Sequence, residues 1–179
     1  PALADPGVVT TVGLWRRARL RPGGHAGGPF AGLAEALVGQ TALPELLAGR
    51  QDTTSLARHL KGSVDDPAFS IVTMLNQIED AARGRGELLA IEKACLVLLV
   101  DQLEELFTTS AVTAEERTAF IRCLDGLARS GRVYVLATMR SDYWHLAAET
   151  PLLVEMAAGN ARLDLLTATQ DEIIEKLFD

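Results

Sequence analysis

The chain has 179 residues, the size of one ordinary domain, and 48% of them are apolar, which excludes disordered, collagen-like and coiled-coil compositions. The formal net charge is −7, from 17 Lys and Arg against 24 Asp and Glu, so bulk positive charge does not favour nucleic-acid or anionic-membrane binding. Cys95 and Cys123 lack the spacing of a zinc site or a disulfide framework. The apolar stretch from Ala94 to Val100 is far shorter than the roughly 20 residues of a membrane span. We therefore expect a soluble, cytoplasmic protein.

The first half of the chain is predicted to form one strand followed by helices. From Leu14 to Arg21 every second side chain falls on the same face, and one face is basic, which predicts an edge strand. We interpret its arginines as a solvated face rather than as an anion-binding stripe. A loop rich in Gly and Pro follows over residues 22–29. Helical spacing of apolar residues predicts helices over 29–38 and 67–83, and two short helical pieces over 43–60.

The second half alternates strands and helices. Leu96 to Val100 is an uninterrupted apolar run, which predicts a strand buried on both faces at the centre of a mostly parallel sheet. A capping-box spacing at Thr113 predicts a helix that ends at Gly131. A second buried strand is predicted over 133–137, a short helix over 150–158, a third inner strand over 162–166 and a terminal helix over 170–178. This order predicts a three-layer α/β domain with a parallel sheet flanked by helices.

Polar residues follow both buried strands, where ligands sit in open α/β sheets. Asp101 places a carboxylate at the tip of a strand, which suits Mg²⁺ beside the phosphates of a nucleotide. Glu104 or Glu105, one helical turn further, could then orient an attacking water. The alternative is that Asp101 caps the next helix and that both glutamates only stabilise its first turn.

Arg140 follows the second buried strand and could reach a terminal phosphate in the same crevice as Asp101, because its planar fork suits phosphate oxygens. The alternative is an ion pair with Asp142 or a contact with a helix end.

At these positions the sequence resembles a known family. Residues 96–108, Leu-Val-Leu-Leu-Val-Asp-Gln-Leu-Glu-Glu-Leu-Phe-Thr, resemble the Walker B segment of the novel STAND NTPases, which are signal-transduction ATPases of the P-loop class. The usual form of that segment is a hydrophobic strand followed by Asp-Gln-Phe-Glu-Glu-Leu-Phe, so only Leu103 departs from it. Residues 135–143 are similar to the fourth strand of the family, in which Arg-x-Asp stands at the first sensor position, and residues 15–23 are similar to its second strand.

This resemblance implies a P-loop NTPase-like fold and an ATP-binding and hydrolysing switch domain with ATP and Mg²⁺ as cofactors. It implies that Asp101 holds Mg²⁺, that Glu104 or Glu105 positions the attacking water, with Glu105 slightly favoured, and that Arg140 reads the terminal phosphate. Other modules of the same polypeptide and further copies of the chain are the implied partners. The alternative function is a non-catalytic α/β interaction or scaffold domain.

The sequence contains no G-x-x-x-x-G-K-[ST] phosphate loop, although this loop cradles the phosphates in such enzymes. Family members carry it, with their first strand, just upstream of a segment like Pro1 to Leu3. We therefore expect residues 1–179 to be a partial STAND NTPase domain that runs from strand two to the region after strand five. A degenerate member without the loop is the alternative. With truncation we expect a gap between the fourth and fifth strands, weak or absent nucleotide binding and no ATPase activity in this chain alone.

Overall fold

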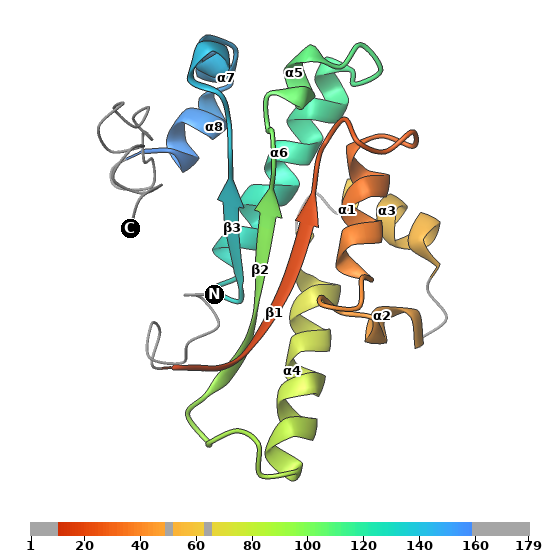
Figure 1. Ribbon diagram of the computed structural model, residues 1–179, viewed down its shortest axis with the longest axis vertical. Coiled ribbons are helices and arrows are strands. Elements are labelled where there is room, and N and C mark those ends of the chain that lie inside the picture. The colour runs from red at the N-terminus through yellow and green to blue at the C-terminus, as the bar shows by residue number, and fades with distance from the viewer. Residues whose placement is uncertain (1–10, 49–51, 63–65, 159–179) are drawn as a thin grey trace, which may run out of the picture.

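The computed structural model describes residues 11–48, 52–62 and 66–158, in which helices flank a parallel sheet (Figure 1). The strands are β1 (Val12–Leu20), β2 (Lys93–Val100) and β3 (Val133–Ala137), in the order β1-β2-β3, and both pairings are parallel. The helices are α1 (Pro29–Leu37), α2 (Glu45–Ala48), α3 (Thr53–Gly62), α4 (Phe69–Gly84), α5 (Glu105–Thr108), α6 (Ala114–Arg129), α7 (Trp144–Ala148) and α8 (Pro151–Met156), with a 3₁₀ turn at Ser141–Tyr143. The predicted α/β class with a parallel, helix-flanked sheet is confirmed.

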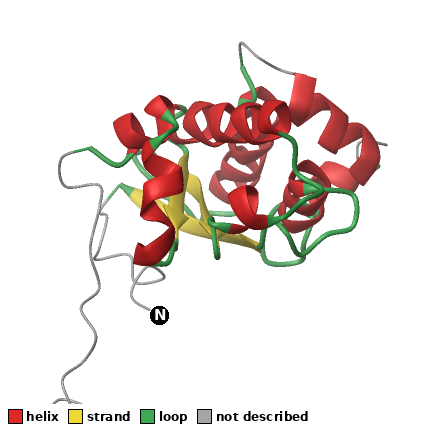
Figure 2. Ribbon diagram, turned by 90° about the horizontal axis from the view of Figure 1, so that it is seen from above, coloured by secondary structure: helices red, strands yellow, loops and turns green. Residues whose placement is uncertain are grey.

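The main hydrophobic core lies between the sheet and the helices that cover one of its faces (Figure 2). Helices α1, α4 and α6 contact β1, β2 and β3, respectively. Leu96 and Leu98 of β2 point into this core and are fully buried. There the rings of Phe30 from α1 and Phe120 from α6 meet edge to face, with centroids 5.3 Å apart. The central, buried position predicted for β2 is therefore confirmed.

The opposite face of the sheet is less covered, and this corrects one prediction. Side chains alternate along a strand, so Cys95 and Val97 point away from the main core. Trp15 of β1 and Tyr134 of β3 approach each other near these residues, with ring centroids 5.3 Å apart. Tyr134 is nevertheless 42% exposed and Leu136 is 47% exposed. The prediction that β3 is buried on both faces is wrong, because an apolar run does not reveal whether a second layer covers the outer face.

Capping residues account for several helix boundaries. Thr113 accepts a hydrogen bond from the Glu116 backbone N–H at 3.2 Å, as the capping-box spacing predicts. Gly131, with φ 67°, follows the end of α6, and Gly86, with φ 73°, follows the end of α4. The strand predicted over 162–166, the helix predicted over 170–178 and hence the expected gap lie outside the described residues. No described helix has the length and apolar character needed to cross a membrane.

A buried ionic network joins α4 to the start of β2 and β3. The Glu79 carboxylate, in a residue only 7% exposed, accepts a hydrogen bond from the Ala94 backbone N–H at 3.1 Å and also pairs with Arg132 and Arg83. Arg132 Nε donates to the Ala94 carbonyl at 3.0 Å. Burial alone would raise the pKa of Glu79, but the Ala94 N–H and the two arginines outweigh it and lower the pKa below its ordinary value. The network fixes where both strands begin relative to α4.

Candidate functional site

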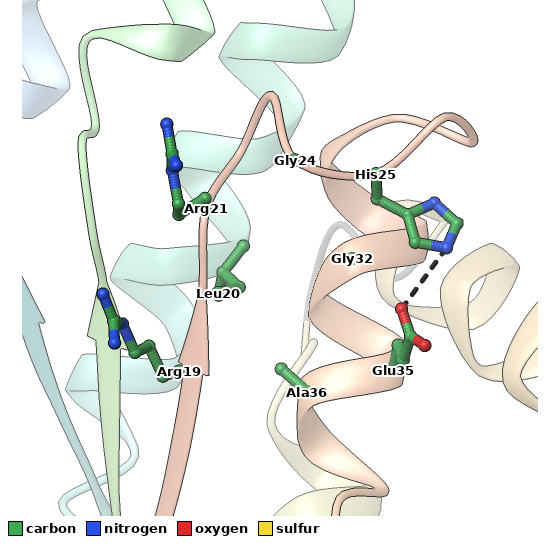
Figure 3. Close-up of a pocket in the computed structure, with 8 residues that line it drawn as sticks. All are labelled: Arg19, Leu20, Arg21, Gly24, His25, Gly32, Glu35 and Ala36. Carbon is green, nitrogen blue, oxygen red and sulfur yellow. Dashed lines mark ion pairs between the residues drawn. The ribbon is translucent and has the colours of Figure 1, made fainter.

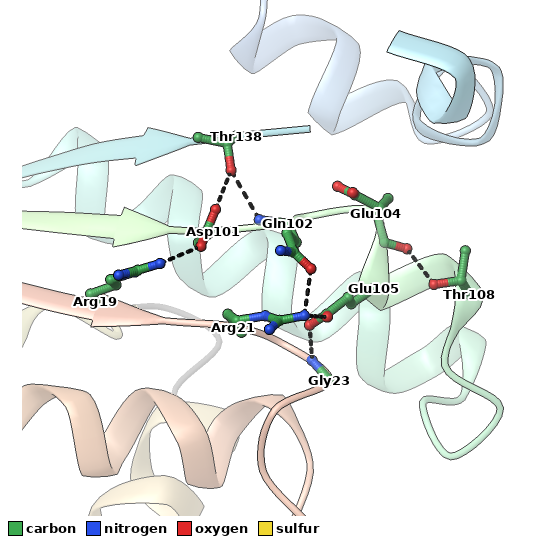
Figure 4. A network of polar contacts seen from close by, with 9 residues as sticks. All are labelled: Arg19, Arg21, Gly23, Asp101, Gln102, Glu104, Glu105, Thr108 and Thr138. Atoms are coloured by element: carbon green, nitrogen blue, oxygen red, sulfur yellow. Dashed lines mark hydrogen bonds and ion pairs between the residues drawn. The ribbon is translucent and has the colours of Figure 1, made fainter. Parts of the chain in front are cut away.

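The carboxyl ends of the three strands carry a network of polar side chains (Figure 4). In the parallel register Leu20 lies opposite Val100, and Val100 lies opposite Ala137. The residues that follow each strand therefore emerge at the same edge of the sheet. This places Asp101 between the end of β1 and the end of β3, as expected for a ligand site in an open α/β sheet.

Asp101 is held by contacts from both neighbouring strands. Its Oδ1 accepts a hydrogen bond from Thr138 Oγ1 at 2.8 Å, and its Oδ2 accepts from Arg19 Nη2 at 2.7 Å. Arg19 first and Thr138 second lower the pKa of Asp101 below its usual value. The carboxylate is therefore ionised and fixed in direction at neutral pH.

The backbone after Asp101 turns sharply, and Thr138 stabilises this turn. Gln102 adopts a left-handed conformation with φ 59°. Its N–H donates to Thr138 Oγ1 at 3.0 Å, and the Leu103 N–H donates to the Thr138 carbonyl at 2.8 Å. Sequence reasoning gave Thr138 no role. A hydroxyl residue directly after a strand was the only available signal.

Glu105 is bound to the loop that follows β1. It forms an ion pair with Arg21, whose guanidinium also contacts the Gln102 side chain. The Glu105 Oε2 atom accepts a hydrogen bond from the Gly23 backbone N–H at 2.9 Å. A Cβ at Gly23 would lie 2.8 Å from Thr109 Oγ1, so a larger residue here would force the Thr109 side chain to shift. These contacts make Glu105 a link between α5 and the 22–28 loop.

Glu104 lies in a different environment. The residue is only 6% exposed, and its Oε2 has no hydrogen-bond partner in the described part of the chain. Figure 4 shows its carboxylate directed back toward the β3 side of the network rather than toward Gly23. Buried carboxylate oxygens normally have partners, so an orphaned one marks a place where a water or ligand group fits.

Arg140 extends from the segment after β3 and is paired within that segment. Its guanidinium donates to both carboxylate oxygens of Asp142, at 3.2 and 2.7 Å, and lies 5.4 Å from the ring centroid of Tyr143. The pKa of Arg140 is raised mainly by Asp142, and the charges of Tyr143 and Glu104 add to this. Arg140 therefore forms the ion pair with Asp142 that was the alternative interpretation of this residue. The pair lies at the same edge of the sheet as Asp101. Its side chain is 68% exposed, which leaves it accessible to a ligand.

A family model described as novel STAND NTPase 1 matches residues 5–177 of the chain. The chain belongs to this family. No curated protein and no solved structure matches it significantly. Membership supports nucleotide binding together with Mg²⁺ in general terms.

In this STAND domain the arginines of β1 do more than the predicted solvation of an edge strand. Arg16 points toward α2 and pairs with Glu45 at 2.8 Å. Arg19 and Arg21 point the other way and pair with Asp101 and Glu105. The sequence contains both sets of charges, but their pairing depends on β1 and β2 being adjacent and parallel. Arg19 and Arg21 remain 67% and 49% exposed, as the interpretation as a solvated face requires, but their ion pairs were not predicted.

A hollow of about 360 Å³ lies between the end of β1 and α1 (Figure 3). On its α1 side His25 Nε2 lies 3.4 Å from a Glu35 carboxylate oxygen. Arg19 and Arg21 also line this hollow and pair with Asp101 and Glu105, so the hollow borders the Asp101 network. The described residues contain no group of three or more His, Cys, Asp or Glu that could enclose a metal ion.

Proposed function

We propose that this domain binds ATP with Mg²⁺ at the carboxyl end of β2 and acts as a nucleotide-dependent switch. The observation that carries the proposal is the position of Asp101, an ionised carboxylate at a strand tip in a member of an NTPase family. Beside it lie the Thr138 hydroxyl and, within the same segment, two glutamates in different environments.

The residues present fit Mg²⁺ held together with phosphates. Mg²⁺ keeps several water ligands and is usually bound through one or two carboxylates plus substrate phosphates, rather than in an all-protein cage. Asp101 supplies one carboxylate, and Thr138 fixes its direction through the 2.8 Å hydrogen bond. When bound, Mg²⁺ would neutralise charge on the phosphate oxygens.

The contacts favour Glu104 over Glu105 as the residue that positions the attacking water. Glu105 is engaged by Arg21 and by the Gly23 N–H, whereas one buried oxygen of Glu104 has no hydrogen-bond partner among the described residues. In the natural polypeptide that contains this domain, we expect Glu104→Gln to lower ATP hydrolysis about 10²-fold or more, the scale of losing a positioned general base. We expect Glu105→Gln to cost less, because its amide oxygen still accepts from Gly23. A larger loss with Glu105→Gln would reverse the assignment.

Arg140 is the proposed reader of the terminal phosphate, because it is exposed and follows the neighbouring strand. To bind phosphate, Arg140 would have to release the Asp142 carboxylate and bind phosphate oxygens in its place. We expect Arg140→Ala to weaken ATP binding more than ADP binding, and equal losses for both nucleotides would reject this role. We further propose that nucleotide state controls self-association and the output of other modules, in the cytoplasm.

The nucleotide site itself is tested by titrating Mg-ATP into the 179-residue chain while recording amide NMR signals, which detect millimolar affinity. We expect shifts at Gln102 and Thr138 that Asp101→Asn removes. Asp125→Asn, in an acid that pairs with Arg129 on α6, is the matched control and should leave them unchanged. Shifts that persist in Asp101→Asn, or that Asp125→Asn removes as well, would contradict the proposal and favour a nucleotide-independent interaction domain.

A further inference from the structure

The cation that accompanies Asp101 in this structure is an arginine of the neighbouring strand. Arg19 Nη2 lies 2.7 Å from Asp101 Oδ2, and Thr138 Oγ1 lies 2.8 Å from Asp101 Oδ1. Both carboxylate oxygens are therefore engaged by donors. We propose that Arg19 is an exchangeable counter-ion of Asp101, which a divalent cation must displace. This inference rests on the proposed cation site at Asp101.

Exchange follows from charge and geometry. A guanidinium and a divalent cation at one carboxylate repel each other, and the Arg19 contact covers the oxygen that Thr138 leaves open. Thr138 is a neutral donor, so it can keep the carboxylate in position when Arg19 leaves. Asp101 also has a side chain only 19% exposed, which limits other directions of approach.

Arg19 is held loosely enough to leave. Its side chain is 67% exposed, and Asp101 is the only side-chain partner that it has in the described part of the chain. Exposed ion pairs contribute little free energy because water solvates the separated charges well. Arg21 differs, because it contacts Gln102 and Glu105 together and is less exposed, at 49%. Arg21 therefore maintains the link between β1 and α5 while Arg19 exchanges.

The displacement connects cation binding to the end of β1. Asp101 is also tied to β1 through its backbone, whose N–H donates to the Leu20 carbonyl at 2.9 Å. The backbone bond holds the strand in register, so the exchange is confined to the Arg19 side chain. Only molecules in which Arg19 has left Asp101 can bind the divalent cation. The apparent affinity is therefore the intrinsic affinity multiplied by the fraction of such molecules.

The test is a Mg²⁺ titration of the 179-residue chain and its variants, followed by NMR. We expect Arg19→Ala to bind Mg²⁺ about two- to fivefold more tightly, the range that corresponds to an exposed ion pair. Arg17→Ala is the matched control. Arg17 lies on the same face of β1, two residues earlier, is exposed and has no side-chain contact with Asp101. Its removal changes the net charge equally, and we expect it to leave the affinity nearly unchanged.

A second signal reports the displacement directly. In the parent chain we expect Mg²⁺ to shift the Arg19 side-chain Nε–Hε resonance toward its value in Asp101→Asn, while the Arg17 resonance stays constant. Equal affinity changes in Arg19→Ala and Arg17→Ala, or an unmoved Arg19 resonance at saturating Mg²⁺, would overturn the inference. Mg²⁺ binding that is insensitive to Asp101→Asn would instead overturn the proposed cation site itself.

Discussion

Removing the Glu79 carboxylate should destabilise the whole domain. Glu79→Ala leaves the Ala94 N–H without its acceptor and leaves Arg132, whose side chain is only 13% exposed, without its carboxylate. Removing one partner of a buried ion pair costs about 3–5 kcal/mol, because the remaining charge is uncompensated. Arg83 is 31% exposed and can turn to water, which favours the lower end of this range. We expect a loss of about 3 kcal/mol in the free energy of unfolding.

Urea unfolding monitored by circular dichroism measures this loss, provided that the slope of the transition is unchanged. Asp80→Ala is the matched control, because Asp80 is the next residue of α4, its side chain is 79% exposed and it lies 3.5 Å from the same Arg83. We expect this exposed pair to contribute less than about 0.5 kcal/mol. Glu79→Gln should be intermediate, because its amide oxygen can still accept from Ala94. Similar losses for Glu79→Ala and Asp80→Ala would refute the assignment of a buried network.

The same network predicts the direction of the pH dependence. The pKa of Glu79 in the folded state lies below its ordinary value of 4.5, so folding favours the ionised carboxylate. The contribution of Glu79 is therefore complete above the unfolded pKa and is lost as the pH falls through the lower, folded-state pKa. The stability difference between the parent chain and Glu79→Gln should shrink as the pH falls below 4.5. A difference that grows in acid would contradict this sign.

Two further predictions follow from side-chain contacts. Thr138→Val removes the hydrogen bond to Asp101, so the pKa of Asp101 should rise, although Arg19 keeps it below the ordinary value. A carboxyl NMR titration measures this pKa, and an unchanged value would contradict the contact. Gly126→Ala should destabilise the domain by about 1–3 kcal/mol, because its Cβ would lie 2.4 Å from a Pro67 ring carbon. Gly84→Ala meets no atom within 4 Å and should stabilise it by about 0.4–1 kcal/mol, so urea midpoints that move in the same direction would refute this contrast.

The elements that the sequence predicts well are those whose signal is local. The continuous apolar run of β2 reports burial on both faces, and the Thr113 capping box marks the start of α6. The bounds of the short α5 and α7 were not predicted, because four or five residues are too few to show a helical period. The exposure of Tyr134 and Leu136 could not be predicted, since it depends on what covers the outer face of the sheet.

The candidate site likewise has features that the sequence predicts and features that it does not. Asp101, Glu104 and Glu105 could be selected from their position after a buried strand, because parallel strands bring their carboxyl ends to one edge. Their different environments could not be predicted, because these depend on side chains from β1 and on burial. The alternation of Arg19 and Arg21 was visible in the sequence, but without the strand order it indicated only an edge strand.

The charges at the strand ends explain why an acidic cluster is tolerated there. Asp101 pairs with Arg19 of β1, Glu105 pairs with Arg21 directly after β1, and Arg140 pairs with Asp142. Glu104 is the member of the cluster without an ion pair in the described residues, and it is also the most buried of the three candidate acids. A buried carboxylate oxygen without a hydrogen-bond partner is costly, and such groups cluster at functional sites. For this reason we propose Glu104, rather than Asp101 or Glu105, as the group that holds a water beside a bound nucleotide.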